Sequence, residues 1–413
     1  MKGILVIADG LGGRPTDMEG RTCLEAARTP YLDELTDRGA VGLVDPIGPG
    51  IRPGSDTAHL SLLGYNPHEL YTGRGVFECL GIGLDVRPGD ICFRANFATV
   101  EATKDGLRLV DRRAGRIESG QKDLEAAIGA MRLKTPGVEI QFRASTEHRG
   151  ALLLRGKDLS PHVSETDPHE VGAAIHTARP MVDGAAAKRT AAAVNELTRQ
   201  SYELLKELPL NRERAAAGKL PANILLVRGA ADCPHIPSIP SIYGVRGAVI
   251  AGGALYRGVA LACGLDSIDV PGATGGLDTN LRAKAEATLA ALATYDLVFV
   301  HIKGTDNAAH DQNAAAKTAF IERIDAEFFA PLVERIDWKS THLAFTGDHT
   351  TSIDYGDHTA DPVPVLFVGP NVRRDDVATF DERAAARGGL LRFSGQVLPM
   401  LMSLANRCPK LGS

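Results

Sequence analysis

Residues 3–13, GILVIADGLGG, join five consecutive apolar residues to an aspartate and a glycine-rich turn. A run of this length is typical of a buried strand, and the glycines that follow indicate a turn that leaves Asp9 at the strand end. Three later segments have the same form, namely DLVFVHIKGTD at 296–306, THLAFTGDHT at 341–350 and PVPVLFVGP at 362–370. Continuous apolar runs of this kind are expected where both faces of a sheet are covered.

Helical patterns lie between these expected strands. Apolar residues share one face of a helix over residues 278–294, and a second helical stretch covers residues 313–336. The alternation of strands with helices predicts a doubly wound α/β core. Functional residues collect at the strand ends of such sheets, and here these ends carry Asp and His side chains.

The middle of the chain has a different pattern. Residues 91–99 and 138–154 alternate like half-buried strands, and an Ala-rich helix follows at about 184–207. We therefore expect an inserted α+β domain, after which the core resumes with the strand NILLV at 223–227. The expected bounds are 72–214 for the insertion and 1–71 with 215–413 for the core.

Composition and charge exclude several classes of function. The 413 residues include 46 Lys and Arg against 51 Asp and Glu, a net charge of −5, so no overall basic field favours nucleic acid or an anionic membrane. The six cysteines are scattered, which is typical of a reducing compartment. The apolar run after Met1 is too short for a signal peptide, and Arg257 interrupts the apolar stretch 248–263. We expect a soluble, cytoplasmic protein.

Carboxylate and imidazole side chains gather at the expected strand ends. Asp306 and His310 are four residues apart and would share one face of a helix, and other such residues end the neighbouring strands. This combination suits Mn²⁺ or Zn²⁺, and two such groups suit a two-metal phosphoryl-transfer site. The candidate ligands are Asp9, Asp306, His310, Asp348, His349 and His358. Taken singly, such an aspartate is more often a turn or helix cap and such a histidine an ordinary loop residue.

A hydroxyl nucleophile is available at Ser55. This residue follows Pro53 and Gly54, and a helix is expected from about residue 57. A hydroxyl at this position lies where the backbone N–H groups of a helix N-terminus favour an anion. Ser55 or Asp56 could equally cap the helix, and the residues alone leave both roles open.

Long motifs along the whole chain resemble those of one family. They are PGIRPGSDTAHLSLLGYNP (49–67), YTGRG (71–75), CFRANFATV (92–100), VDRRAGRI (110–117), VPGATG (270–275), HIKGTD (301–306) and GDHTADPVPVLFVGP (356–370). The chain is similar to the archaeal-type, cofactor-independent (2,3-bisphosphoglycerate-independent) phosphoglycerate mutases of the alkaline phosphatase superfamily. The resemblance implies an alkaline-phosphatase-like core and the interconversion of 3-phosphoglycerate and 2-phosphoglycerate in glycolysis and gluconeogenesis.

The resemblance also implies a role for each candidate residue. Ser55 would be the nucleophile that becomes transiently phosphorylated. One metal would be held by Asp9, Ser55, Asp348 and His349, and the other by Asp306, His310 and His358. The family resemblance implies two divalent ions, Mn²⁺ first and Mg²⁺, Co²⁺ or Zn²⁺ in some members, and no 2,3-bisphosphoglycerate. We expect the inserted domain to close and exclude water, because water would hydrolyse a phosphoserine.

The inserted domain supplies most of the candidate substrate ligands. The Asp-Arg-rich turn at Asp111, Arg112, Arg113 and Arg116 resembles a substrate-binding signature, and arginine is a natural bidentate partner of phosphate and carboxylate. Further candidates are His148, Arg149, Asp167, His169 and Lys303. The alternatives are an exposed basic turn, an ordinary polar loop and, for the lysine, an amine directed to solvent.

Two other functions fit parts of this pattern. One is a phosphomonoesterase or a homoserine-kinase-like phosphotransferase on the same scaffold, and the other is a non-catalytic metal-binding protein. The motifs PGSDTAH (53–59) and DRRAGRI (111–117) favour the mutase, and the presence of all seven ligand and nucleophile positions argues against a non-catalytic role. The expected partner is the phosphoglycerate substrate, with no nucleic acid and no membrane, and no sequence feature indicates an oligomeric state.

Overall fold

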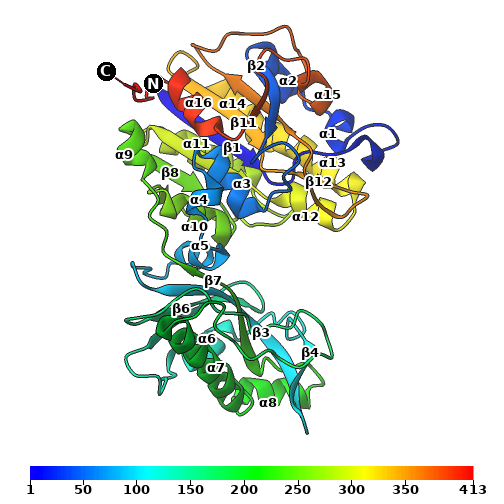
Figure 1. The fold of residues 1–413 in the computed structure, drawn as a ribbon. Helices are drawn as coiled ribbons and strands as arrows, with labels where there is room; N and C mark the ends of the chain where they lie inside the picture. Colours follow the sequence, from blue (N-terminus) through cyan, green and yellow to red (C-terminus); the bar gives the residue numbers. More distant parts are fainter. Residues whose placement is uncertain (413) are drawn as a thin grey trace. The chain divides into compact units, whose positions relative to one another are not determined.

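The computed structural model describes residues 1–412 and divides into two compact units (Figure 1). The larger unit contains Met1–Tyr71 and the chain from Ile236 onward, and the smaller unit contains Thr72–His235. The smaller unit is therefore an insertion into the larger one. Within the described residues, no helix combines the length and the apolar character needed to cross a membrane.

An eight-stranded mixed sheet forms the centre of the larger unit. Its strand order is β15-β2-β14-β11-β1-β10-β8-β9. The strands are β1 (Lys2–Ala8), β2 (Ala40–Asp45), β8 (Gly247–Ile250), β9 (Asp266–Ser267), β10 (Leu297–Ile302), β11 (Thr341–Gly347), β14 (Val363–Val368) and β15 (Leu391–Ser394). The central strand β1 is parallel to both of its neighbours, β10 and β11. The four apolar runs found in the sequence thus form β1, β10, β11 and β14, and the α/β core is confirmed.

Strand β14 runs antiparallel to both β11 and β2. Between β11 and β14 the chain forms only the hairpin of β12 (Thr350–Ser352) and β13 (Asp357–Thr359). Since no crossover helix carries the chain back to the other end of the sheet, β14 has to return in the opposite direction. The hairpin directly follows Asp348 and His349 and brings His358 back to the same end of the sheet.

Helices cover both faces of this sheet. Ile4 and Val6 of β1 face one core, while Gly3 lies against α16 on the other face. The helices of the larger unit are α1 (Cys23–Ala26), α2 (Pro30–Asp37), α3 (Ser55–Leu62), α4 (Pro67–Leu70), α9 (Ile239–Tyr243), α10 (Ala254–Ala262), α11 (Leu281–Ala291), α12 (Gly304–His310), α13 (Ala314–Arg323), α14 (Ala330–Arg335), α15 (Glu382–Ala385) and α16 (Val397–Leu404). Burial of both faces explains why the strands are continuous apolar runs rather than alternating ones.

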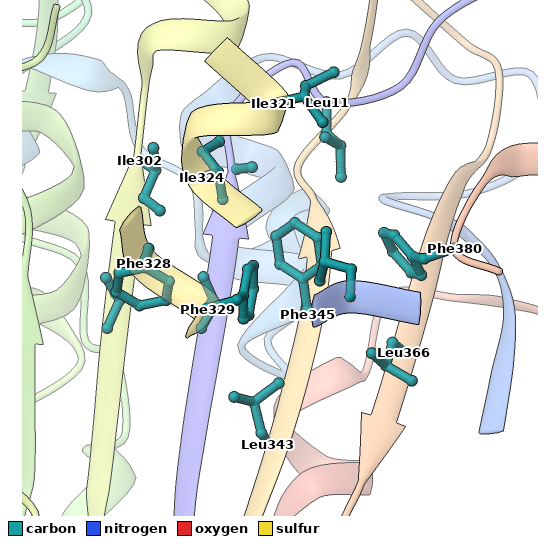
Figure 2. Packing of buried hydrophobic residues seen from close by; sticks show 14 of the residues in the cluster. Leu11, Ile302, Ile321, Ile324, Phe328, Phe329, Leu343, Phe345, Leu366 and Phe380 are labelled. Atoms are coloured by element: carbon teal, nitrogen blue, oxygen red, sulfur yellow. The ribbon is translucent and has the colours of Figure 1, made fainter. Parts of the chain in front are cut away.

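An aromatic cluster fills the core beneath the π-helical turn Ile324–Phe329, which joins α13 to α14. Phe329 packs edge-on against Phe345 of β11 with ring centroids 4.8 Å apart, and Phe345 also contacts Phe380 (Figure 2). Aromatic pairs in this geometry stabilise a core beyond the area they bury. The packing therefore fixes β11, the strand that Asp348 directly follows.

The smaller unit is built on a second, antiparallel sheet. Its long strand β3 pairs with β6 and β7 along its first part and with β4 along its second. The elements are α5 (Arg74–Gly81), β3 (Ile91–Thr103), β4 (Gly106–Asp111), α6 (Gln121–Gly129), β5 (Glu139–Ala144), β6 (Arg149–Arg155), α7 (Ala185–Leu205), α8 (Pro209–Ala216) and β7 (Ile224–Asp232). This α+β unit has its own buried core, which includes Phe93, Phe97 and Leu197.

The smaller unit ends at His235 rather than at residue 214, where we expected its boundary. The strand expected to resume the core is β7, and it pairs instead with β3 of the insertion. Leu225 and Val227 of β7 are buried in the core of the smaller unit. An apolar run is compatible with either sheet, so the pattern of residues could not decide between them.

Candidate active site

The ends of three adjacent strands bring the predicted metal ligands together. Asp9 follows β1, Asp348 and His349 follow β11, and β10 leads into α12, which carries Asp306 and ends at His310. Because these three strands are parallel, their carboxyl ends meet at one edge of the sheet. All of these side chains belong to the larger unit.

Asp9, Asp348 and His349 form a first group of possible ligands, with one ligand atom of each within 4.8 Å of the others. The Nε2 atom of His349 lies 3.4 Å from Oδ1 of Asp9 and 3.3 Å from Oδ2 of Asp348. All three side chains are completely buried. Such a group of buried carboxylates and imidazole suits a divalent cation.

A second group is centred on Asp306. Its Oδ1 atom lies 3.3 Å from Nε2 of His310 and 3.6 Å from Nε2 of His358. The two groups adjoin, because the rings of His349 and His358 stack with centroids 3.5 Å apart. One ligand atom of Asp357 also lies within 4.8 Å of those of His310 and His358, and no sequence motif singled this residue out. The structure thus brings together all six side chains predicted as ligands besides Ser55.

The three imidazoles are oriented in the same way. Each places Nδ1 against another protein group: Thr351 Oγ1 at 3.0 Å for His349, the Gly356 carbonyl at 2.9 Å for His310 and the Pro53 carbonyl at 2.9 Å for His358. Metal-binding histidines typically donate their second ring N–H in this manner. The Nε2 atoms are consequently directed at the carboxylates, as ligation of a shared ion requires.

The electrostatics of the first group also fit a bound cation. Burial, together with the nearby charge of Asp9, raises the pKa of Asp348 to about 8. Burial would likewise raise the pKa of Asp9, but the ammonium of Lys303 and the adjacent imidazoles of His301 and His349 hold it well below its usual range. Oδ1 of Asp9 and Oδ2 of Asp348 are buried, and no hydrogen-bond donor among the described residues reaches them. Buried oxygens left in this state are costly unless a cation binds them.

Ser55 is the first residue of α3, and Gly54 is the N-cap. The Ser55 Oγ atom does not cap the helix but lies 3.3 Å from Nε2 of His349. Asp56 makes the local contacts instead, accepting from the backbone N–H of Thr57 and from the Tyr71 hydroxyl. The hydroxyl of Ser55 is therefore free to face the first ligand group at the positive end of a helix.

Lys303 lies between the two ligand groups. Its Nζ atom donates to Asp9 Oδ2 at 3.2 Å and to Asp306 Oδ2 at 2.6 Å, and it lies over the ring of Tyr256. Burial would lower the pKa of this amine, but the carboxylates of Asp9 and Asp306 raise it well above its usual range. The amine of Lys303 is therefore held as a cation inside the site. The alternative considered from the sequence, an amine directed to solvent, does not apply.

The smaller unit brings part of the predicted substrate set together. Arg112 makes a two-point contact with Asp167 at 3.1 and 2.6 Å, and its guanidinium also lies 3.0 Å from Nδ1 of His169. Arg228 of β7 approaches the same carboxylate at 3.8 Å, and its Nε is buried without a hydrogen-bond partner among the described residues. Sequence reasoning missed Arg228 because it assigned the strand before it to the larger unit.

The remaining candidates of the smaller unit have more local surroundings. Asp111 accepts from the backbone N–H groups of Arg113 and Gly115 and so shapes its own turn. The other positively charged members, Arg113, Arg116 and Arg149, are exposed. Burial and the charge of Arg149 lower the pKa of His148 to about 4, so this buried imidazole is neutral. The charges of Arg149 and Arg113 act on His148, so these three residues lie near one another, and the contact of this group with substrate stays a prediction.

The fold and the site together define an α/β protein with a buried serine at the start of α3, beside a candidate metal centre. Comparison with known proteins identifies the family within this class. A family model described as 2,3-bisphosphoglycerate-independent phosphoglycerate mutase matches residues 36–211. The mutase of this name from Archaeoglobus fulgidus is 48% identical over 99% of both chains, and that from Methanopyrus kandleri is 46% identical over 99% of this chain and 98% of its own.

Two solved structures agree with these relatives. A cofactor-independent phosphoglycerate mutase from Thermoplasma acidophilum is 38% identical, with a TM-score of 0.72 over 98% of this chain and 100% of its own. A Pyrococcus horikoshii protein is 37% identical, with a TM-score of 0.86 over 100% of this chain and 99% of its own. The chain belongs to the family of 2,3-bisphosphoglycerate-independent phosphoglycerate mutases. The resemblance inferred from the sequence motifs is confirmed.

Proposed function

We propose that this protein interconverts 3-phosphoglycerate and 2-phosphoglycerate by passing the phosphoryl group through Ser55. The observation that carries the proposal is the position of Ser55 Oγ at the start of α3, 3.3 Å from His349 and beside buried carboxylate oxygens that lack donors. A hydroxyl in such a place is suited to accept and return a phosphoryl group. The protein would act in a reducing, cytoplasmic environment, as its scattered free cysteines favour.

The residues present fit two divalent metal ions. Asp9, Asp348 and His349 with Ser55 would hold one ion, and Asp306, His310 and His358 would hold the other. Mixed carboxylate and imidazole ligands favour Mn²⁺, with Mg²⁺, Co²⁺ or Zn²⁺ as possible replacements. When bound, such ions lower the pKa of a ligated hydroxyl and neutralise phosphoryl oxygens. No 2,3-bisphosphoglycerate is required, because the serine itself carries the phosphoryl group.

In the first half-reaction, Ser55 Oγ forms a bond to phosphorus while the bond from phosphorus to O3 of the substrate breaks. The proton of the serine hydroxyl is lost and O3 of glycerate gains one, so the half-reaction is balanced. The ammonium of Lys303 offsets negative charge near the transferring group. Glycerate then reorients, O2 takes the phosphoryl group from Ser55, and the serine regains its proton.

Glycerate has to remain bound between the two half-reactions, and water has to be kept from the phosphoserine. We propose that the smaller unit, Thr72–His235, supplies groups for both purposes. Arg112, Arg113 and Arg116 would bind the carboxylate of the substrate, and Arg228 joins them as a candidate. The remaining predicted ligands are Asp111, His148, Arg149, Asp167 and His169.

The direct test compares substrates under defined metal conditions. Metal-depleted protein would be supplied with Mn²⁺ and assayed with 3-phosphoglycerate, with homoserine plus ATP, and with a generic phosphate ester. We expect 2-phosphoglycerate as the main product without added 2,3-bisphosphoglycerate. Ser55→Ala should remove this activity, whereas the matched control Ser61→Ala, a second buried serine of α3, should retain it. Main activity toward homoserine or the phosphate ester would overturn the proposal.

A further inference from the structure

The hydroxyl of Thr351 lies between the two predicted metal subsites. This residue is on β12 and is completely buried. Its Oγ1 atom is 3.0 Å from Nδ1 of His349, in the first subsite, and 2.9 Å from Oδ1 of Asp306, in the second. Across the hairpin Thr351 pairs with His358, which also belongs to the second subsite. One side chain that is not itself a predicted ligand thus adjoins ligands of both subsites.

The direction of these two hydrogen bonds follows from the proton count. The hydroxyl carries one proton, and the ionised carboxylate of Asp306 can only accept. Thr351 therefore donates to Asp306 and accepts from Nδ1–H of His349. The His349 ring can make this contact either as the neutral tautomer with its proton on Nδ1 or as the cation with a proton on both nitrogens. In the neutral form the lone pair is on Nε2, the atom that faces Ser55, Asp9 and Asp348.

The position of Thr351 is itself tightly fixed. The completely buried Lys317 donates from Nζ to the carbonyls of Thr351 and Gly12, both at 2.8 Å. The backbone N–H of Thr351 donates to the same Gly12 carbonyl. On the other side, a Cβ atom at Gly10 would lie 2.5 Å from Thr351 Oγ1, so only glycine leaves room for the hydroxyl. This framework holds Oγ1 between its two partners.

We propose that Thr351 is a positioning residue that couples the two metal subsites. Its hydroxyl fixes the ring of His349 for ligation at the first subsite and holds Asp306 for ligation at the second. Because one hydroxyl serves both partners, its removal would disturb the ligand geometry of both subsites at once. This role rests on the metal site proposed above.

The experiment uses three variants of the full chain. Thr351→Val keeps the shape of the side chain without the hydroxyl, and Thr351→Ser keeps the hydroxyl. Thr350→Val is the matched control, because Thr350 is equally buried but its hydroxyl contacts the Asp361 carbonyl rather than a predicted ligand. Mn²⁺ binding to metal-depleted protein would be measured by titration calorimetry. We expect Thr351→Val to weaken both binding steps by about 10–100-fold, while the other two variants retain most of the affinity.

A second measurement does not depend on bound metal. Nitrogen-15 NMR of labelled histidines in the metal-depleted protein, in alkaline buffer, should show His349 with its proton on Nδ1 in the wild type and in Thr351→Ser. If Thr351→Val does not fold, two other results decide whether Thr351 has this role. They are the position of the proton on His349 in the wild type and the Mn²⁺ affinity of Thr351→Ser. Wild-type affinities in folded Thr351→Val, or a wild-type His349 protonated on Nε2, would overturn the role of Thr351. If the wild type binds no Mn²⁺, the proposed metal site is wrong, and this role is lost with it.

Discussion

Acidification should weaken Mn²⁺ binding at both subsites, because a proton occupies one ligand of each subsite in the metal-free protein. Burial and the charge of Asp9 raise the pKa of Asp348 to about 8, and the hydrogen bond to Asp306 raises that of His310 to about 9. Both groups therefore hold their proton at neutral pH, and metal has to displace it. The Mn²⁺ affinity is therefore highest above these pKa values, and it falls as the pH drops below them.

The size of the loss in Mn²⁺ affinity follows from the two pKa values. Between about pH 8 and pH 6, competition by one proton with a pKa of about 8 reduces apparent affinity by about 50-fold at the subsite of Asp348. With a pKa of about 9, the reduction is about 90-fold at the subsite of His310. Near pH 7, loading both subsites should release about two protons per protein from Asp348 and His310 together.

Titration calorimetry in buffers of different protonation enthalpy measures both the Mn²⁺ affinity and the number of protons released on binding. Asp348→Asn should reduce the release to about one proton, whereas the control Asp354→Asn, which alters an exposed carboxylate, should behave as the wild type. Affinity that does not change over this pH range, or binding without proton release, would refute the assignment of these two residues as ligands. A release that is unaffected by Asp348→Asn would exclude Asp348 alone.

Three further outcomes are expected for metal removal and for two single substitutions. Chelation should inactivate the protein and Mn²⁺ should restore it, as a coupled assay without 2,3-bisphosphoglycerate would show; full activity in verified metal-free protein would contradict the metal site. Arg112→Ala, which breaks the pair with Asp167, should slow turnover and raise the ratio of inorganic phosphate to 2-phosphoglycerate; an unchanged ratio and rate would make this arginine a structural residue. Lys317→Met should lower the free energy of unfolding by about 2–4 kcal/mol, since the carbonyls of Gly12 and Thr351 lose a buried donor; a urea titration that shows no change would refute this.

The strands and the grouping of the candidate ligands could be predicted because both depend on local sequence and on one rule of topology. Apolar runs such as that of β1 predict buried strands, and the carboxyl ends of parallel strands share one edge of the sheet. Asp9 and Asp348 were therefore expected to meet, and they do. The pair Asp306 and His310 was expected on one helix face, and α12 places it there.

Other features depend on which elements pair and on how side chains orient, and a single sequence does not carry this information. The apolar run of β7 fits either sheet, so the boundary at His235 and the place of Arg228 were missed. The cap at Gly54 could not be told from one at Ser55, because their difference lies in backbone conformation. The role of Thr351 depends on hydrogen bonds across 45 residues of sequence, for which no local pattern exists.

The central claim is that Ser55 carries the phosphoryl group between the two positions of glycerate. The protein loaded with Mn²⁺ would be mixed with 3-phosphoglycerate labelled with phosphorus-32, quenched in acid within one turnover, and digested for mass spectrometry. The account predicts label on the peptide that contains Ser55, and neither label nor 2-phosphoglycerate with Ser55→Ala. Label on another residue, or continued interconversion by Ser55→Ala, would contradict it.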